Sequence, residues 1–267
     1  MPENTVLKDL LEAASEAAYQ AGKITLSYFQ TAHIEVETKA DDSPVTLADK
    51  KAEQFIRQFI QTRFPYHAML GEEFGEIPGT SPYRWIIDPI DGTKSFIHGV
   101  PLYGTMIGIE DRRIEDAVAG VVYFPALNEL YSAAKGLGAY CNGRRIQVSS
   151  VQKLKDAVVL VTDMTQAYDH PKAECYDAIQ RGSKFVRTWG DCYGHMLVAA
   201  GRAEIMLDPK MHLWDVAALK PIIEEAGGKF FDWNGTNGLY IDDALACNAE
   251  LEHEVVELLD IQNLSDF

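Results

Sequence analysis

The sequence contains little cysteine for its length. Its 267 residues include four cysteines, none of which forms a C-x-x-C pair: Cys141, Cys175, Cys192 and Cys247. Such scattered positions predict reduced thiols, with a disulfide left open as an alternative.

Positive charge is also scarce. Only 24 Lys and Arg residues stand against 40 Asp and Glu residues, which leaves a net charge of −16. A chain this acidic argues against nucleic acid or an anionic membrane as a partner. It can still bind a phosphate if cations screen its carboxylates.

Long apolar runs are missing as well. No stretch approaches the ~20 apolar residues of a membrane-spanning helix, and the first residues lack a basic region followed by an apolar core. We therefore expect a cytoplasmic protein. The hydrophobic content of 47% is ordinary for a globular chain that forms one large domain or two intimately packed ones.

The first half of the chain combines helices with a run of strands. Apolar residues at helical spacing predict helices over residues 5–29 and 46–64, with Thr46 as N-cap of the second. Strands are predicted over 33–38, 103–110, 117–124, 129–134 and 139–148, with a hairpin turn at Asn142-Gly143 and a polar loop over 39–44. Residues 1–150 thus form an α+β half.

A polar link over residues 149–156 is the predicted domain boundary. Beyond it, in residues 151–267, predicted strands alternate with predicted helices. The strands are 157–162, 184–187, 203–207 and 229–231, and the helices are 171–181, 190–200 and 214–226. This alternation predicts an α/β half whose sheet is covered on both faces.

The most informative stretch is residues 85–96, where a buried strand ends in Asp88-Pro89-Ile90-Asp91-Gly92-Thr93. Proline breaks the strand, Asp91 and Gly92 turn the chain, and Thr93 can begin a helix. Two carboxylates thus project from a strand-to-helix turn, and Mg²⁺ prefers such oxygen ligands. Amides at a helix start suit a phosphate. The alternative is an ordinary Asx-type turn.

Four further positions are candidates with simpler alternatives. Glu72 belongs to a glycine-framed acidic pair that could be a solvated loop, and Asp49 could merely compensate a helix dipole. Asp215 opens a predicted helix and could be a cap. His195 lies in a core-facing helical register, so we expect a structural histidine with satisfied hydrogen bonds.

Three motifs in order resemble one family. They are Gly71-Glu72-Glu73, the residue 85–93 motif, and Trp214-Asp215-Val216-Ala217-Ala218 followed by Glu225-Ala226-Gly227-Gly228. Over nearly the whole chain, this set is similar to the lithium-sensitive, metal-dependent phosphomonoesterases of the inositol monophosphatase type. The resemblance implies a layered α-β-α-β-α sandwich of the α/β (α+β) class, and a homodimer.

The resemblance also implies roles for individual residues. Metal ligands would be the side chains of Glu72, Asp88, Asp91 and Asp215 and the carbonyl of Ile90, holding two or three Mg²⁺ ions. Asp49 and Thr93 would help activate the attacking water with support from Glu72, and the Gly92 and Thr93 amides would bind phosphate. Such a cation site neutralises the phosphate dianion, lowers the pKa of a bound water and stabilises the leaving alkoxide.

The specificity region resembles the histidinol-phosphate phosphatase branch of the family, on residues 187–195, Asp208-Pro209 with Met211, and residues 218–225. A small phosphorylated metabolite with a cationic amine is therefore the expected substrate. The implied substrate-binding residues are Gly92, Thr93, Arg187, Gly190, Asp191, Cys192, Asp208 and Asp215. Alternatives are an inositol-1-monophosphatase, a broad-specificity sugar or polyol phosphatase, and a non-catalytic Mg²⁺-binding regulator.

Overall fold

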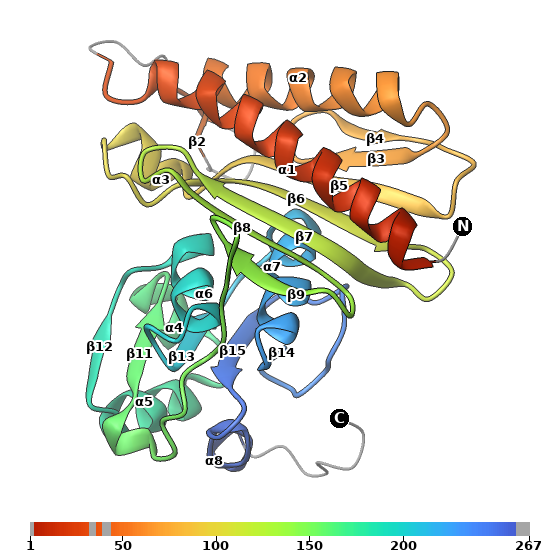
Figure 1. Ribbon diagram of the computed structural model, residues 1–267. Helices are drawn as coiled ribbons and strands as arrows, with labels where there is room; N and C mark the ends of the chain where they lie inside the picture. Colours follow the sequence, from red (N-terminus) through yellow and green to blue (C-terminus); the bar gives the residue numbers. More distant parts are fainter. Residues whose placement is uncertain (1–2, 32–35, 39–43, 260–267) are drawn as a thin grey trace.

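The computed structural model describes residues 3–31, 36–38 and 44–259. Its first half is an eight-stranded sheet with strand order β10-β9-β8-β7-β6-β5-β3-β4, beside a two-stranded pair of β1 and β2. Two long helices, α1 (Glu3–Tyr28) and α2 (Leu47–Arg63), cover one face of the large sheet (Figure 1). The strands are β1 (Val36–Thr38), β2 (Pro44–Thr46), β3 (Ala68–Gly71), β4 (Gly75–Ile77), β5 (Tyr83–Asp91), β6 (Gly104–Asp111), β7 (Asp116–Phe124), β8 (Glu129–Ala134), β9 (Gly138–Cys141) and β10 (Arg144–Arg145).

The second half contains a five-stranded mixed sheet of order β12-β11-β13-β15-β14. Helices α6 (Asp191–Ala199) and α7 (Leu213–Glu225) pack between this sheet and the large one, whereas α4 (Met164–Asp169), α5 (Ala173–Gly182) and α8 (Glu252–Leu258) cover its outer face (Figure 1). The layers therefore follow the predicted α-β-α-β-α order. The remaining elements are α3 (Thr93–Ile97), the 3₁₀ turn η1 (Leu154–Asp156), β11 (Val158–Val161), β12 (Phe185–Arg187), β13 (Ile205–Asp208), β14 (Gly228–Phe231) and β15 (Ala244–Asn248).

Helix α7 lies unusually close to the large sheet because two strand residues lack side chains. A Cβ on Gly108 of β6 would lie 2.5 Å from the Ala217 carbonyl carbon, and one on Gly120 of β7 would lie 2.1 Å from the Ala218 oxygen. Real Cβ atoms do not approach backbone this closely, so both positions require glycine. The close packing sets the height of α7, and with it Asp215, above the sheet.

Most predicted elements of the first half are confirmed. The two long helices form nearly as predicted, and the Thr46 hydroxyl accepts a hydrogen bond from the Ala48 amide as the N-cap of α2. The Asn142-Gly143 turn is also present, and it divides the predicted strand 139–148 into β9 and β10. The predicted strand 33–38 is described only from Val36, and the predicted loop 39–44 lies outside the described residues except for Pro44.

In the second half the predicted strands and helices are present, but four elements were missed. Helices α4 and α8, the 3₁₀ turn η1 and strand β15 were not predicted. Strand β15 pairs antiparallel with both β13 and β14, so the sheet is mixed. The residue 149–156 boundary stays a prediction, although one hydrophobic cluster joins Met106 and Val122 of the first half to Met206 and Val216 of the second.

All four cysteines are free thiols, as predicted. Within the described ranges, no helix combines the length and apolar character needed to cross a bilayer.

Candidate metal and substrate site

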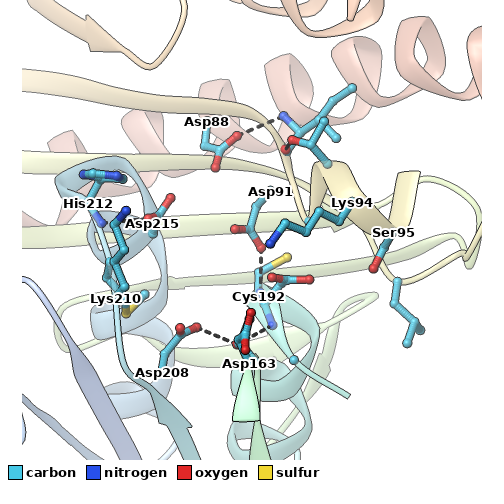
Figure 2. Close-up of a pocket in the computed structure, with 18 of the residues that line it drawn as sticks. Asp88, Asp91, Lys94, Ser95, Asp163, Cys192, Asp208, Lys210, His212 and Asp215 are labelled. Carbon is cyan, nitrogen blue, oxygen red and sulfur yellow. Dashed lines mark hydrogen bonds between the residues drawn. The ribbon is translucent and has the colours of Figure 1, made fainter. Parts of the chain in front are cut away.

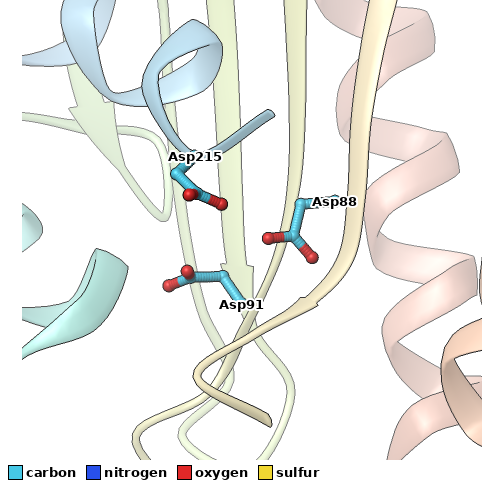
Figure 3. Close-up of side chains that lie close together, drawn as sticks. All are labelled: Asp88, Asp91 and Asp215. Atoms are coloured by element: carbon cyan, nitrogen blue, oxygen red, sulfur yellow. The ribbon is translucent and has the colours of Figure 1, made fainter. Parts of the chain in front are cut away.

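Three carboxylates converge where β5 ends and α7 begins. Oxygens of Asp88, Asp91 and Asp215 all lie within 4.8 Å of one another (Figure 3). We call these three residues the carboxylate trio. Carboxylate oxygens are suitable ligands for a hard divalent cation, so the donor set fits a metal site.

A β-bulge explains how Asp88 and Asp91 reach the same site. Residues three apart on a regular strand point to opposite faces of the sheet. Here Asp88 pairs with Met106 and Asp91 pairs with Gly104, so the three-residue step on β5 faces a two-residue step on β6. The extra residue turns both carboxylates to one side. Asp88 Oδ1 also accepts a hydrogen bond from the Ile90 amide at 2.9 Å, which closes the turn.

Asp215 combines the two roles that the sequence left open. It is the third residue of α7, and its Oδ2 accepts a hydrogen bond from the His212 amide at 2.7 Å. The carboxylate thus supports the start of the helix and belongs to the trio at once. The positive end of the α7 dipole adds a favourable term for the ionised form.

Burial and mutual repulsion favour the protonated forms of the trio when no cation is present. Burial and the neighbouring charges of Glu72, Asp91 and Asp215 raise the pKa of Asp88 well above its usual value. Burial and Asp91 do the same to the pKa of Asp215. Burial raises the pKa of Asp91 to about 6, although hydrogen bonds from Cys192 oppose this shift. A bound cation would remove the repulsion, which again fits a metal site.

Asp91 links the two halves of the protein. Its Oδ2 accepts a hydrogen bond from the Cys192 amide at 2.6 Å, so the end of β5 is tied to the first turn of α6. Cys192 is buried, and burial together with the Asp91 charge raises the pKa of its thiol. Cys192 therefore supports Asp91 rather than presenting a reactive thiolate.

A cleft of about 830 Å³ opens beside the trio, and a second acidic group lies on its other wall (Figure 2). We call Asp163, Asp191 and Asp208 the wall carboxylates. Thr162 joins two of them, because its Oγ1 donates to Asp208 Oδ2 at 2.8 Å and accepts from the Asp191 amide at 2.9 Å.

Asp191 is the wall carboxylate most strongly affected by its surroundings. Burial, Asp91 and Asp208 raise its pKa well above the usual value. The backbone at Asp191 has a φ of 53°, and this left-handed conformation is uncommon for a non-glycine residue. Gly190 is the N-cap of α6, and no side-chain cap bond is present there. Asp191 therefore does not cap α6, and its side chain lines the cleft instead.

Most other predicted site residues also line this cleft. They are Glu72, Ile90, Gly92, Thr93, Gly190 and Cys192. Two predicted residues do not. Asp49 is buried, and its Oδ2 accepts hydrogen bonds from the Thr46 amide and hydroxyl at 2.8 and 2.6 Å. Arg187 is exposed, and its guanidinium lies 5.0 Å from the centre of the Phe185 ring.

The predicted Asp49–Thr93 pair is not joined by a hydrogen bond in the described part of the chain. Thr93 Oγ1 instead donates to the Ile90 carbonyl at 3.0 Å. Burial raises the pKa of Asp49 to about 6, against the opposing effect of its bonds to Thr46.

The expectation of a satisfied His195 is wrong. The ring is fully buried, and neither of its nitrogens has a hydrogen-bond partner among the described residues. Nε2 lies 3.7 Å from Asp208 Oδ2, beyond normal hydrogen-bond length. The helical register of residues 190–200 correctly predicted burial but carried no information about a partner.

Several cleft residues were missed by the sequence analysis. They are Lys94, Ser95, Asp163, Gln166, Lys210 and His212. For Asp163 a usable signal existed, since it follows the predicted strand 157–162 at its carboxyl end, where α/β proteins gather ligand-binding residues. Lys210 and His212 stand between two predicted site residues, Asp208 and Asp215, but no pattern distinguishes them from surface residues.

The protein thus combines a layered α-β-α-β-α fold with a carboxylate trio in a cleft between its two halves. Such a cleft suits a cation and a small ligand. Residues 6–263 match the model of the inositol monophosphatase family. The chain therefore belongs to that family, as its three motifs predicted. One solved relative, the extragenic suppressor protein suhB from Bartonella henselae, superposes with a TM-score of 0.87 at 29% identity, covering 94% of this chain and 98% of that one.

Two curated relatives indicate which members of the family the chain resembles. A protein named histidinol-phosphatase from Chlorobaculum parvum is 49% identical over 236 residues, which cover 88% of this chain and 90% of the relative. A fructose-1,6-bisphosphatase/inositol-1-monophosphatase from Aquifex aeolicus is 35% identical over 239 residues, 84% of this chain and 86% of the relative. The predicted resemblance to the histidinol-phosphate phosphatase branch is thus confirmed.

Proposed function

We propose that the protein is a Mg²⁺-dependent phosphomonoesterase that hydrolyses histidinol phosphate to histidinol and phosphate. The observation that carries this proposal is the presence of two acidic groups in one cleft. The carboxylate trio suits the cations needed by a phosphate dianion, and the wall carboxylates suit a cationic amine on the alcohol. The name of the Chlorobaculum parvum relative supports the same substrate.

The cation site would be formed by the trio, the Glu72 side chain and the Ile90 carbonyl. Two or three Mg²⁺ ions would neutralise the phosphate, lower the pKa of a bound water and stabilise the leaving alkoxide. The Gly92 and Thr93 amides, at the turn into α3, would donate to a phosphate oxygen.

The chain itself supplies the proton acceptor and the orientation of the water. The Thr93 hydroxyl, at the start of α3, donates a hydrogen bond to the Ile90 carbonyl and would orient the attacking water. Asp49 does not line the cleft, so it would accept the proton only through an intervening water. A pKa of about 6 leaves its carboxylate ionised at neutral pH while keeping it a better base than an ordinary aspartate.

Substrate selection would rest on the wall carboxylates. Asp191 and Asp208 would hold the ammonium of histidinol, with Gly190 and Cys192 shaping the cleft beside them. Arg187 would not contact the substrate, because it is exposed and its guanidinium lies over the Phe185 ring.

A second candidate is a broad-specificity phosphatase for sugar or inositol phosphates, which the name of the Aquifex aeolicus relative supports. A non-catalytic regulator is disfavoured by the complete carboxylate trio. Homodimer formation, sensitivity to lithium and a cytoplasmic location remain predictions that rest on the sequence.

The deciding experiment compares kcat/KM on histidinol phosphate and on inositol 1-phosphate, each with Mg²⁺ and with excess EDTA. We expect activity on both to require Mg²⁺, with a clear preference for histidinol phosphate. Equal kcat/KM on the two substrates would favour the broad-specificity candidate. Activity that survives EDTA would refute the cation site.

A further inference from the structure

A buried ion pair on α2 lies outside the cleft and has no place in the proposed chemistry. Glu53 and Arg57 are one helical turn apart on the buried side of α2, where the other buried residues, apart from Asp49, are apolar. Glu53 is 0% exposed and Arg57 7% exposed, and Arg57 Nε donates to Glu53 Oε1 at 2.6 Å. Desolvation makes such a pair a poor source of stability compared with apolar residues of similar size. The pair therefore calls for another explanation.

The remaining hydrogen bonds of the pair all go to one turn. Glu53 Oε2 accepts from the Glu73 amide at 2.7 Å, and Oε1 accepts from the Phe74 amide at 3.2 Å. Arg57 Nη2 donates to the Gly75 carbonyl. These are the backbone groups that directly follow Glu72, in the connection between β3 and β4 that lies beneath α2 (Figure 1).

The residue before Glu72 is shaped to admit the pair. A Cβ on Gly71 would lie 2.0 Å from Glu53 Oε1 and 2.8 Å from Arg57 Nη2, so no other residue fits while the pair is in place. Gly71 pairs with Ile87 on β5, and the Glu72 amide donates to the Ile87 carbonyl at 3.1 Å. The backbone of Glu72 is thus held on its strand side by the residue next to Asp88, and on its turn side by Glu53.

Arg57 does not use all of its hydrogen-bond donors. Its Nη1 is buried and has no hydrogen-bond partner in the described ranges. The centre of the Phe74 ring lies 5.9 Å from the guanidinium carbon. An arginine selected only for stability would be expected to bond all its buried N–H groups. Arg57 instead keeps a position in which Nε donates to Glu53 and Nη2 donates to the Gly75 carbonyl.

We propose that Glu53 and Arg57 are positioning residues that hold the Glu72 turn, so that the Glu72 carboxylate faces Asp88 and completes the cation site. The proposal rests on the proposed function, because it requires that the cleft binds a divalent cation. Glu72 and Asp88 line the same cleft, which places the Glu72 side chain beside the carboxylate trio. Loosening the turn would move this carboxylate, whereas the trio carboxylates have hydrogen bonds of their own to Ile90, Cys192 and His212.

The test measures Mn²⁺ and Mg²⁺ affinity by titration calorimetry without substrate, on wild type, Glu53→Gln and Arg57→Lys. Glu110→Gln is the matched control, because Glu110 is also buried and accepts from an arginine Nε, that of Arg84, at 2.7 Å, outside the cleft. We expect cation affinity to fall roughly 10- to 100-fold in Glu53→Gln and less in Arg57→Lys. Glu110→Gln should lower the melting temperature but leave the affinity unchanged.

A double-mutant cycle separates positioning from general destabilisation. If Glu53 acts through Glu72, adding Glu53→Gln to Glu72→Gln should cause no further loss of affinity. Equal losses in both backgrounds, or a Glu53→Gln affinity equal to wild type, would overturn the positioning role alone. If Glu53→Gln does not fold, Arg57→Lys carries the same cycle. A wild-type protein that binds neither cation would overturn the proposed function and the positioning role together.

Discussion

At the scale of single residues, most site carboxylates satisfy a local structural need as well as facing the cleft. Asp88 closes a turn, Asp91 bonds the Cys192 amide and Asp215 supports the start of α7. These bonds leave part of each carboxylate free to bind a cation. The simple structural alternatives considered from the sequence were therefore not wrong: Asp215 supports the start of α7 and also belongs to the trio, and Asp49 bonds Thr46 at the start of α2.

Asp191→Asn is expected to weaken selection for a cationic alcohol. A charge-assisted hydrogen bond to an ammonium is worth ~1.5–3 kcal/mol. The variant should therefore lose roughly ten- to a hundred-fold in kcat/KM on histidinol phosphate and little on glycerol phosphate. Steady-state kinetics on both substrates provide the measurement, with Asp177→Asn on α5, a half-buried aspartate outside the cleft, as control. Equal losses on both substrates would contradict a role in selection.

Asp91→Asn is expected to stabilise the metal-free protein at neutral pH. The folded-state pKa of about 6 exceeds the ordinary 3.8, so folding favours the protonated form. That contribution is fully present below about pH 4 and is lost as the pH rises through about 6. Asparagine does not titrate, so in EDTA the variant should gain roughly 1–3 kcal/mol over wild type between these pH values.

Urea denaturation in EDTA from about pH 4 to about pH 7.5 measures this difference. Adding Mg²⁺ at the higher pH should raise the free energy of unfolding of wild type more than that of the variant, because the ion binds the folded wild-type trio. If the difference in free energy of unfolding between the two proteins does not depend on pH, folding does not raise the pKa of Asp91.

At the scale of secondary-structure elements, the site depends on where β5 and α7 end. The β5 bulge turns Asp88 and Asp91 to one side, and the glycines of β6 and β7 allow α7 to bring Asp215 within reach. The Glu53–Arg57 pair adds Glu72 from a third element. Each element would contribute one or two of the proposed ligands, so a small shift of any of them would open the site.

Gly120→Ala is expected to affect both stability and cation binding. The new methyl group would overlap the Ala218 carbonyl of α7, and overpacking of this kind costs roughly 1–3 kcal/mol. Relief of the overlap would lift α7 and move Asp215 away from the other two carboxylates. Urea denaturation and calorimetric Mg²⁺ titration test the two effects. Gly238→Ala is the control, since its Cβ would meet nothing closer than 3.7 Å. Unchanged Mg²⁺ affinity in a destabilised Gly120→Ala protein would separate α7 packing from the site.

At the scale of the whole molecule, the two halves share one core and one cleft. The central helices α6 and α7 belong to the second half by sequence, yet they cover the face of the large sheet opposite α1 and α2. Without them, side chains such as Met106, Val122 and Phe124 would face water. Asp215 likewise reaches Asp88 and Asp91 only in the complete molecule.

A fragment of residues 1–150 is therefore expected not to fold on its own. It should bind a hydrophobic dye and show no cooperative thermal transition, whereas the full chain should unfold cooperatively. Size-exclusion chromatography and calorimetry of the fragment test this expectation. A monomeric fragment with a sharp transition would instead make the residue 149–156 link a true domain boundary.

The sequence by itself determined the elements that local patterns encode and the residues of the three motifs. Helical periodicity predicted α1 and α2, turn chemistry predicted the Asn142-Gly143 hairpin, and spacing around Asp88 and Asp91 predicted a cation site. Strand β15 escaped because Ala244–Asn248 is a short apolar run, whose strand state depends on pairing with β13 and β14.

Only the tertiary structure decided which residues meet. It brought Asp163 and Lys210 into the cleft, left Arg187 outside it and buried His195 without a hydrogen-bond partner. It also placed Glu53 and Arg57 within hydrogen-bond distance of the turn after Glu72. The physical reason is that helical and strand periodicity report which side of an element is buried, whereas hydrogen bonds and charge contacts depend on atoms that other elements bring within a few ångströms.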